Sequence, residues 1–151
     1  MADGLNWKAA VKLVKGFARG KYSPVEVTQA CLAQITRRDP ILNAMCGVHG
    51  EEALAAARGS EQRWHKGRPR GPLDGVPVLV KDILLVRGWA TLRGSRTIDP
   101  AQDWQHDAPS VARLRESGAI LLGQTTTPDF GWKGVILVDG RIVASGGIKD
   151  G

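Results

Sequence analysis

The sequence is poor in cysteine and in aromatic residues, and it contains no long apolar run. Two cysteines in 151 residues are too few for a disulfide scaffold, and they form no C-x-x-C pair. We therefore expect a reducing, cytoplasmic environment in which Cys31 and Cys46 are small buried side chains. No run approaches the roughly 18 apolar residues of a membrane span, and no apolar segment follows the N-terminus as in a signal peptide. The sequence thus predicts neither secretion nor insertion into a membrane.

Patterns typical of metal and cofactor sites are also missing. The three histidines, His49, His65 and His106, share no metal-ligand spacing, so we expect no metal site. Residues 118–125 approach a phosphate-binding loop, but Gln124 stands where that loop requires lysine and the intervening residues are strand-like. No bound cofactor is expected. The five tryptophans are widely spread and are not interleaved with basic residues, which argues against base stacking.

Positive charge is concentrated near the N-terminus. The chain has 21 Lys and Arg against 15 Asp and Glu, a net charge of +6. One face of an N-terminal helix would carry the basic residues Lys8, Lys12, Lys15 and Arg19. The opposite, apolar face would carry Trp7, Val11, Val14, Phe17 and Ala18. Such a helix suits a nucleic acid or a membrane surface, but it equally suits the solvated face of an ordinary surface helix, so we expect neither partner.

Helices and buried strands alternate along the chain. Ser23-Pro24-Val25-Glu26 forms a capping box with proline at the first helical position, and Asp39-Pro40 should end that helix. Further helices are predicted over 51–66 and 107–117, a basic Gly/Pro-rich loop over 67–72, and strands over 42–48, 76–80, 83–86 and 119–122. The runs over 76–80 and 83–86 are nearly continuous apolar sequences, as expected when both faces of a sheet are covered, and 119–122 is predicted as another buried strand. The fold class is therefore α/β, with a sheet covered by helices.

The C-terminal segment has a different pattern. The apolar run over 135–138 and the segment Arg141-Ile142-Val143-Ala144 are separated by Asp139-Gly140, which suits a type I′ turn in a two-residue hairpin. We therefore expect two parts in this chain, residues 1–135 and a divergent hairpin-like tail over 136–151.

Lys81-Asp82 is the most informative dipeptide for chemistry. Two charges stand between two apolar runs, and a lysine at the end of a buried strand loses hydration, which lowers its pKa toward the range of a general base. An alternative is that Lys81 ends an exposed strand while Asp82 caps it or pairs with it. The local sequence leaves both interpretations open.

Four segments, taken in order, resemble the amidase signature family. They are Gly71-Pro72-Leu73-Asp74-Gly75-Val76-Pro77-Val78-Leu79-Val80-Lys81-Asp82, Thr91-Leu92-Arg93-Gly94-Ser95, Asp107-Ala108-Pro109-Ser110-Val111 and Gly123-Gln124-Thr125-Thr126-Thr127-Pro128-Asp129-Phe130-Gly131. Ser23–Glu26 and Leu42-Asn43-Ala44 fit the family's N-terminal helices and first strand. The resemblance covers about residues 5–135, which correspond to the front part of such an enzyme and its mixed, helix-covered sheet.

The resemblance implies hydrolysis of a small-molecule carboxylic amide to an acid and ammonia or an amine. Members of the family use a serine nucleophile, a second serine held by a cis peptide bond, and a lysine, and Lys81 matches that lysine. A neutral lysine can accept the nucleophile's proton through the bridging serine, after which an acyl-enzyme forms and water cleaves it. Burial would keep Lys81 neutral, whereas the neighbouring charge of Asp82 would favour the protonated form.

The chain departs from the family pattern after Gly134. The glycine-rich stretch that bears both serines should follow there, but the Asp139-Gly140 hairpin takes its place. Ser145-Gly146-Gly147 imitates part of that stretch without the paired serine. We therefore expect a chain that stops before the two serines and has no turnover alone. The alternative is a non-catalytic binding or structural module that associates through its open sheet edge.

Overall fold

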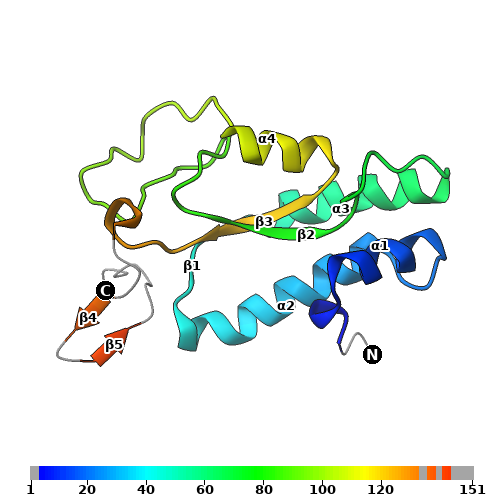
Figure 1. The fold of residues 1–151 in the computed structure, drawn as a ribbon, viewed down its shortest axis with the longest axis horizontal. Helices are drawn as coiled ribbons and strands as arrows, with labels where there is room; N and C mark the ends of the chain where they lie inside the picture. The colour runs from blue at the N-terminus through cyan, green and yellow to red at the C-terminus, as the bar shows by residue number, and fades with distance from the viewer. Residues whose placement is uncertain (1–3, 133–135, 139–140, 144–151) are drawn as a thin grey trace.

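The structure is a computed structural model that describes residues 4–132, 136–138 and 141–143 (Figure 1). The N-terminal half contains η1 (Leu5–Trp7), α1 (Ala10–Ala18), α2 (Pro24–Leu42), β1 (Met45–Val48) and α3 (Gly50–His65). The remainder contains β2 (Pro77–Lys81), α4 (Pro109–Glu116), β3 (Ile120–Thr125), η2 (Asp129–Gly131), β4 (Ile136–Val138) and β5 (Arg141–Val143). No helix in the described part is long and apolar enough to cross a membrane.

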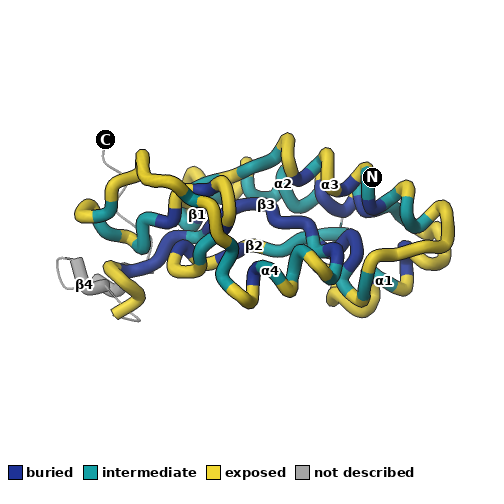
Figure 2. The backbone as a smooth tube through the Cα atoms, turned by 90° about the horizontal axis from the view of Figure 1, so that it is seen from above, coloured by how far each residue is buried: buried dark blue, intermediate teal, exposed yellow. Residues whose placement is uncertain are grey.

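A mixed three-stranded sheet with the order β1-β3-β2 forms the centre of the fold. β3 pairs parallel with β2 and antiparallel with β1. Alternate residues of β3 point to opposite faces: Ile120 and Leu122 pack with α2 and α3, while Leu121 packs with Val111 of α4. α2 and α3 accordingly lie on one side of the sheet and α4 on the other, and the buried stretch follows β3 (Figure 2). The predicted α/β fold with a helix-covered mixed sheet is confirmed.

The predicted start of α2 is confirmed, but its predicted end is not. Ser23 Oγ accepts from the Glu26 amide at 3.2 Å, and Glu26 Oε2 accepts from the Ser23 amide at 2.7 Å, which completes the capping box. The helix continues past Pro40 to Leu42. Proline is tolerated here because the turn ends at once: the Asn43 amide bonds the Asp39 carbonyl at 2.7 Å, and Asn43 itself has a left-handed φ of 48°.

The predicted strand over 83–86 is absent from the structure. The amides of Ile83 and Leu84 both bond the carbonyl of Lys81, at 2.7 and 3.0 Å, so the chain turns directly after β2. Val86 forms only an isolated bridge with Trp89. The apolar run therefore reflects a turn that leaves Ile83 and Leu84 38% and 36% exposed, and not a strand covered on both faces.

The basic helix is present as α1, but its buried face differs from the predicted one. Leu13, Gly16 and Phe17 are buried, whereas Trp7 and Val11 are 77% and 65% exposed. Leu13 and Phe17 pack with Val27 of α2 and with Val76. Tyr22 lies against the same face, because a Cβ at Gly16 would lie 2.1 Å from its ring.

The structure also bears on the two cysteines and the tail. Cys31 is half-buried, but Cys46 is exposed, so the prediction of two buried thiols is wrong for Cys46, which lies on an edge strand. β4 pairs antiparallel with β5, with Ile136 opposite Val143, as expected for a hairpin. The predicted turn at Asp139-Gly140 and the segment Ser145-Gly146-Gly147 lie outside the described residues.

A candidate active-site segment around Lys81

Lys81 lies at the carboxyl end of β2, opposite Thr125 of the parallel strand β3. Its ammonium group donates to the carbonyl of Thr126, the residue directly after β3. The Lys81 side chain is exposed, so of the two interpretations that the sequence left open, the structure agrees with a lysine at the end of an exposed strand and not with a buried one. The physical reason is its place on the sheet: β2 is bonded to β3 on one side only, and Lys81 is its last residue.

Asp82 is buried, with 4% exposure, and its carboxylate is directed at backbone amides. Its two oxygens accept from the amides of Leu92 and Gly94, at 3.0 and 3.3 Å. Arg93 and Gly94 both have left-handed φ values, 56° and 65°, so successive amides form a concave anion-binding nest. Burial raises the pKa of the Asp82 carboxyl, and the hydrogen bonds from the Gly94, Leu92 and Arg93 amides and the Arg93 charge only partly oppose this.

The nest loop, residues 92–94, is fixed to the segment that follows β3. The Phe130 amide donates to the Arg93 carbonyl at 2.8 Å, and a Cβ at Gly94 would lie 2.3 Å from the Thr127 carbonyl oxygen. Next to them, Gln124 Nε2 donates to Thr91 Oγ1 at 3.1 Å within the protein interior. Three of the segments that carry the family resemblance, around Lys81, Arg93 and Thr127, therefore meet at the end of the sheet where the parallel strands β2 and β3 finish.

An open hollow of about 430 Å³ lies beside the nest loop. It is lined by aromatic, charged and amide side chains, among them Arg93, Gln102, Trp104, His106 and Phe130. The fourth segment borders this region: the Ala108 amide donates to the Leu85 carbonyl at 2.8 Å. The hollow beside the nest loop thus offers space and polar groups for a small ligand, although Lys81 itself is not among its lining residues.

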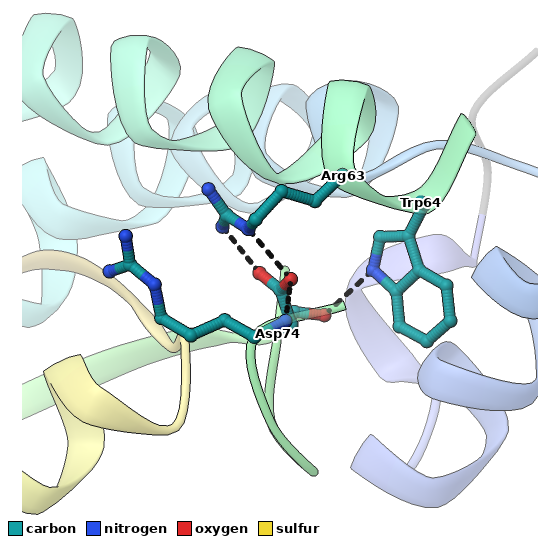
Figure 3. Close-up of polar contacts among 4 residues, drawn as sticks. Arg63, Trp64 and Asp74 are labelled. Carbon is teal, nitrogen blue, oxygen red and sulfur yellow. Dashed lines mark hydrogen bonds and ion pairs between the residues drawn. The ribbon is translucent and has the colours of Figure 1, made fainter. Parts of the chain in front are cut away.

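A buried carboxylate that the sequence patterns did not reveal organises the chain just before β2. Asp74 accepts from Arg63 Nε at 2.9 Å, from Arg63 Nη2 at 2.6 Å and from the Arg70 amide at 2.7 Å, while its carbonyl accepts from Trp64 Nε1 at 3.1 Å (Figure 3). Burial raises the pKa of Asp74, but the bonds from Arg63, Arg70 and Ser60 and the Arg63 charge outweigh it and lower the pKa overall. The signal available in the sequence was an aspartate between apolar residues just before a strand.

A second missed cluster joins β1 and α3 to the loop after β2. The rings of His49 and Trp89 stack with centroids 3.8 Å apart and planes 3° apart. Glu52 accepts from Trp89 Nε1 at 3.1 Å and lies 3.9 Å from His49 Nδ1. Burial lowers the pKa of His49, and the charge of Glu52 partly offsets that effect.

The sequence predicts caps, loops or helix surfaces for Ser23, Ser60, Ser95, Ser110 and Ser117. Ser23 is the N-cap of α2, and Ser117 follows α4 with its hydroxyl donating to the Arg113 carbonyl at 2.7 Å. Ser60 differs, because it is fully buried in α3. Its hydroxyl is among the groups that lower the pKa of the buried Asp74, and a Cβ on Gly75 would lie 2.8 Å from its Oγ, so the expectation of a surface residue is wrong.

Comparisons with known proteins agree with this geometry. A profile of the family described as Amidase matches residues 26–135. The chain is 43% identical over 132 residues to the A subunit of glutamyl-tRNA(Gln) amidotransferase from Salinispora tropica, covering 86% of this chain and 26% of that protein. It is similar to the structure of a bacterial aryl acylamidase of the amidase signature family, with a TM-score of 0.79, 31% identity and coverage of 85% and 27%.

The structure of peptide amidase from Stenotrophomonas maltophilia gives a TM-score of 0.73 at 32% identity, with coverage of 82% of this chain and 25% of that one. The chain therefore spans about a quarter of the length of the relatives that it matches.

Proposed function

Since this chain belongs to the amidase family, we propose that it supplies the lysine-bearing part of an amide-hydrolysing site, with Lys81 as the general base. The observation that carries the proposal is the position of Lys81. Its ammonium group lies at the carboxyl edge of parallel strands, beside the Thr126 carbonyl and within reach of solvent. Ligands of α/β sheets bind at this edge.

The proposed chemistry is general-base activation of a serine. After losing its proton, Lys81 Nζ accepts the proton of a nucleophilic serine through a bridging serine, and the serine oxygen attacks the amide carbonyl. The lysine returns the proton through the bridging serine to the leaving nitrogen, so that collapse of the tetrahedral intermediate expels ammonia or an amine and leaves an acyl-serine ester. Water, giving up its proton to Lys81 by the same route, then hydrolyses this ester to the acid and regenerates the serine. The names of the relatives, an amidotransferase subunit, an aryl acylamidase and a peptide amidase, share the amide C–N bond and differ in the rest of the substrate. A carboxylic amide is therefore the proposed substrate class.

We further propose that the 151-residue chain alone does not turn over amides. The paired serines of the family pattern have no match among the four segments that carry the resemblance. Without a nucleophile and an oxyanion hole, a general base has nothing to activate. The domain assignment belongs to the same proposal: residues 1–135 form the amidase part, and residues 136–151 form a separate tail.

A chimera tests the role of Lys81. In the full-length A subunit of a glutamyl-tRNA(Gln) amidotransferase, the region that matches residues 26–135 is replaced by those residues of this chain, and ammonia release from an amide is measured. We expect an active chimera in which Lys81→Ala lowers kcat by a factor on the order of 10² to 10⁴. Lys66→Ala is the matched control, because Lys66 is an exposed lysine at the C-terminal end of α3. Full activity in the Lys81→Ala chimera would refute the role of Lys81 as general base. Turnover by the 151-residue chain that disappears with Lys81→Ala would refute the proposal that this chain is inactive alone.

A second candidate function is association through the sheet edge. In the described residues no strand pairs with the outer side of β2, and Leu79 on that strand is 42% exposed. An open edge with apolar side chains favours pairing with a second chain. One relative is named as a subunit of an amidotransferase, which is consistent with a chain that works in an assembly.

A further inference from the structure

The ammonium group of Lys81 is held by a neutral group, although a carboxylate is its neighbour in the chain. Nζ donates to the Thr126 carbonyl, and the Asp82 carboxylate is directed at the amides of residues 92 and 94. Among the ion pairs of the described residues, none involves Lys81. An ion pair would favour protonated lysine, which is the form that cannot accept a proton.

The Asp82 carboxylate is held by the amides of the nest loop. Asp82 is buried, and its own amide donates to the Thr125 carbonyl at 2.9 Å, which fixes its backbone to the end of β3. A buried carboxylate requires several hydrogen bonds, and the left-handed Arg93 and Gly94 present amides that supply them. Asp82 and the nest loop therefore hold each other in place.

The carbonyl that binds Lys81 is positioned from two sides. On one side the Thr126 amide donates to the Ala44 carbonyl at 2.9 Å. On the other side the nest loop packs against the next peptide group, with Gly94 against the Thr127 carbonyl and the Arg93 carbonyl bonded to Phe130. A shift of the nest loop must therefore move the peptide groups that follow Thr126.

We propose that Asp82 is a positioning residue for Lys81: by filling the nest at residues 92–94 it fixes the Thr126 carbonyl that orients the Lys81 amine, and it keeps its own charge away from that amine. The catalytic meaning of this positioning rests on the proposed function of Lys81. The positioning itself is a property of the 151-residue chain, and it is measurable without any turnover.

The experiment measures the chemical reactivity of Lys81. The chain is labelled with trace acetic anhydride at pH 8, and mass spectrometry gives the acetylation rate of each lysine, with the exposed Lys66 as internal reference. Asp82→Asn weakens the nest and removes a charge, whereas Gly94→Ala displaces the loop from the Thr127 carbonyl without changing any charge. We expect both variants to raise the Lys81 rate by about fivefold, the factor that corresponds to loss of one hydrogen bond.

Matched controls separate positioning from general effects. Gly67 has the same left-handed φ of 65° as Gly94, but a Cβ added at Gly67 would have no atom within 4 Å. Gly67→Ala therefore strains the backbone as Gly94→Ala does, without pushing against a neighbouring carbonyl. Glu116→Gln is the control for the change of charge, because it removes one carboxylate charge from the exposed pair with Arg113 on α4. Both controls should leave the Lys81 rate within about twofold of the parent.

The outcomes are decisive in each direction. A rise with Asp82→Asn but not with Gly94→Ala would show a purely electrostatic effect and overturn the proposal. An unchanged Lys81 rate in both variants would also overturn it. If Asp82→Asn does not fold, the comparison of Gly94→Ala with Gly67→Ala decides alone. None of these results depends on whether Lys81→Ala abolishes activity in the chimera, so the two proposals fail separately.

Discussion

The guanidinium of Arg63 and the carboxylate of Asp74 form a two-pronged ion pair, with N–O distances of 2.9 and 2.6 Å. Asp74 is fully buried, whereas the Arg63 side chain is 29% exposed. The pair joins the last turn of α3 to the chain just before β2, and β2 ends at Lys81 (Figure 3). The position of the candidate site thus depends on a contact at the opposite end of the same strand.

Loss of this pair should destabilise the fold strongly. We expect Asp74→Asn to lower the free energy of unfolding by about 3 kcal/mol, because it leaves Arg63 without its buried partner. Glu116→Gln is the control, since it breaks the exposed pair between Arg113 and Glu116 and should cost less than about 1 kcal/mol. Urea denaturation at pH 7, followed by circular dichroism, gives both values. Equal effects of the two substitutions would contradict this account.

The Asp74 contribution should disappear in acid. Its pKa is lowered from the ordinary value of 3.8 in the folded state, so the unfolded chain binds more protons between the two values. The stabilisation is complete above the unfolded pKa and is lost as the pH falls through the folded one. Asp82 has a raised pKa and acts in the opposite sense, losing its contribution as the pH rises through its folded value. The difference between parent and Asp74→Asn in urea titrations should therefore shrink from pH 5 to pH 3, and a constant difference would argue against the assignment.

Gly118 should be required for the same network. Its φ is 84°, and a Cβ there would lie 2.7 Å from Asp74 Oδ1 and 2.8 Å from Asp74 Cα. Gly88 has a φ of 85° and no atom within 4 Å of such a Cβ. We expect Gly88→Ala to cost about 1 kcal/mol for the left-handed backbone alone, and Gly118→Ala to cost about 3 kcal/mol because it also displaces Asp74. Thermal or urea unfolding measures the loss of stability in each variant. Equal losses in Gly118→Ala and Gly88→Ala would contradict the proposed contact with Asp74.

The pKa of His49 should lie below its ordinary value of 6.5, because burial against Trp89 disfavours the imidazolium. Glu52 acts against this shift, so Glu52→Gln should lower the pKa of His49 further. Glu51→Gln, at the adjacent position of the same helix turn, is the control. NMR titration of the His49 ring protons measures the shift. An increase in the pKa after Glu52→Gln would rule out the proposed balance of forces.

The edge of β2 should promote self-association. Leu79 is 42% exposed on this strand, and a lysine there would disfavour pairing with a second chain. We expect oligomers of the parent chain to shift toward monomer in Leu79→Lys. Leu84→Lys is the control, since Leu84 is 36% exposed but lies in the turn beyond the strand. Size-exclusion chromatography over a concentration series reports the outcome, and a monodisperse parent monomer would exclude association through this edge.

Local patterns predicted most of the secondary structure. The capping box at Ser23, the helix over 50–65 and the apolar runs of β2 and β3 each depend on residues within a few positions of one another. The ordered motifs around Lys81 also predicted the family, and the match over residues 26–135 confirms it. The strand predicted over 83–86 was wrong because apolar periodicity does not reveal that the amides of Ile83 and Leu84 turn back to Lys81.

The sequence by itself determined most of the element types, the alternation that produces a helix-covered sheet, and the lysine that matches the family. Only the tertiary structure decided that Lys81 is exposed on an edge strand, that Asp82 binds the amides of residues 92–94, and that Arg63 meets Asp74. The physical reason is distance along the chain. These contacts join residues ten or more positions apart, so their geometry follows from how helices and strands pack and not from the preferences of neighbouring residues.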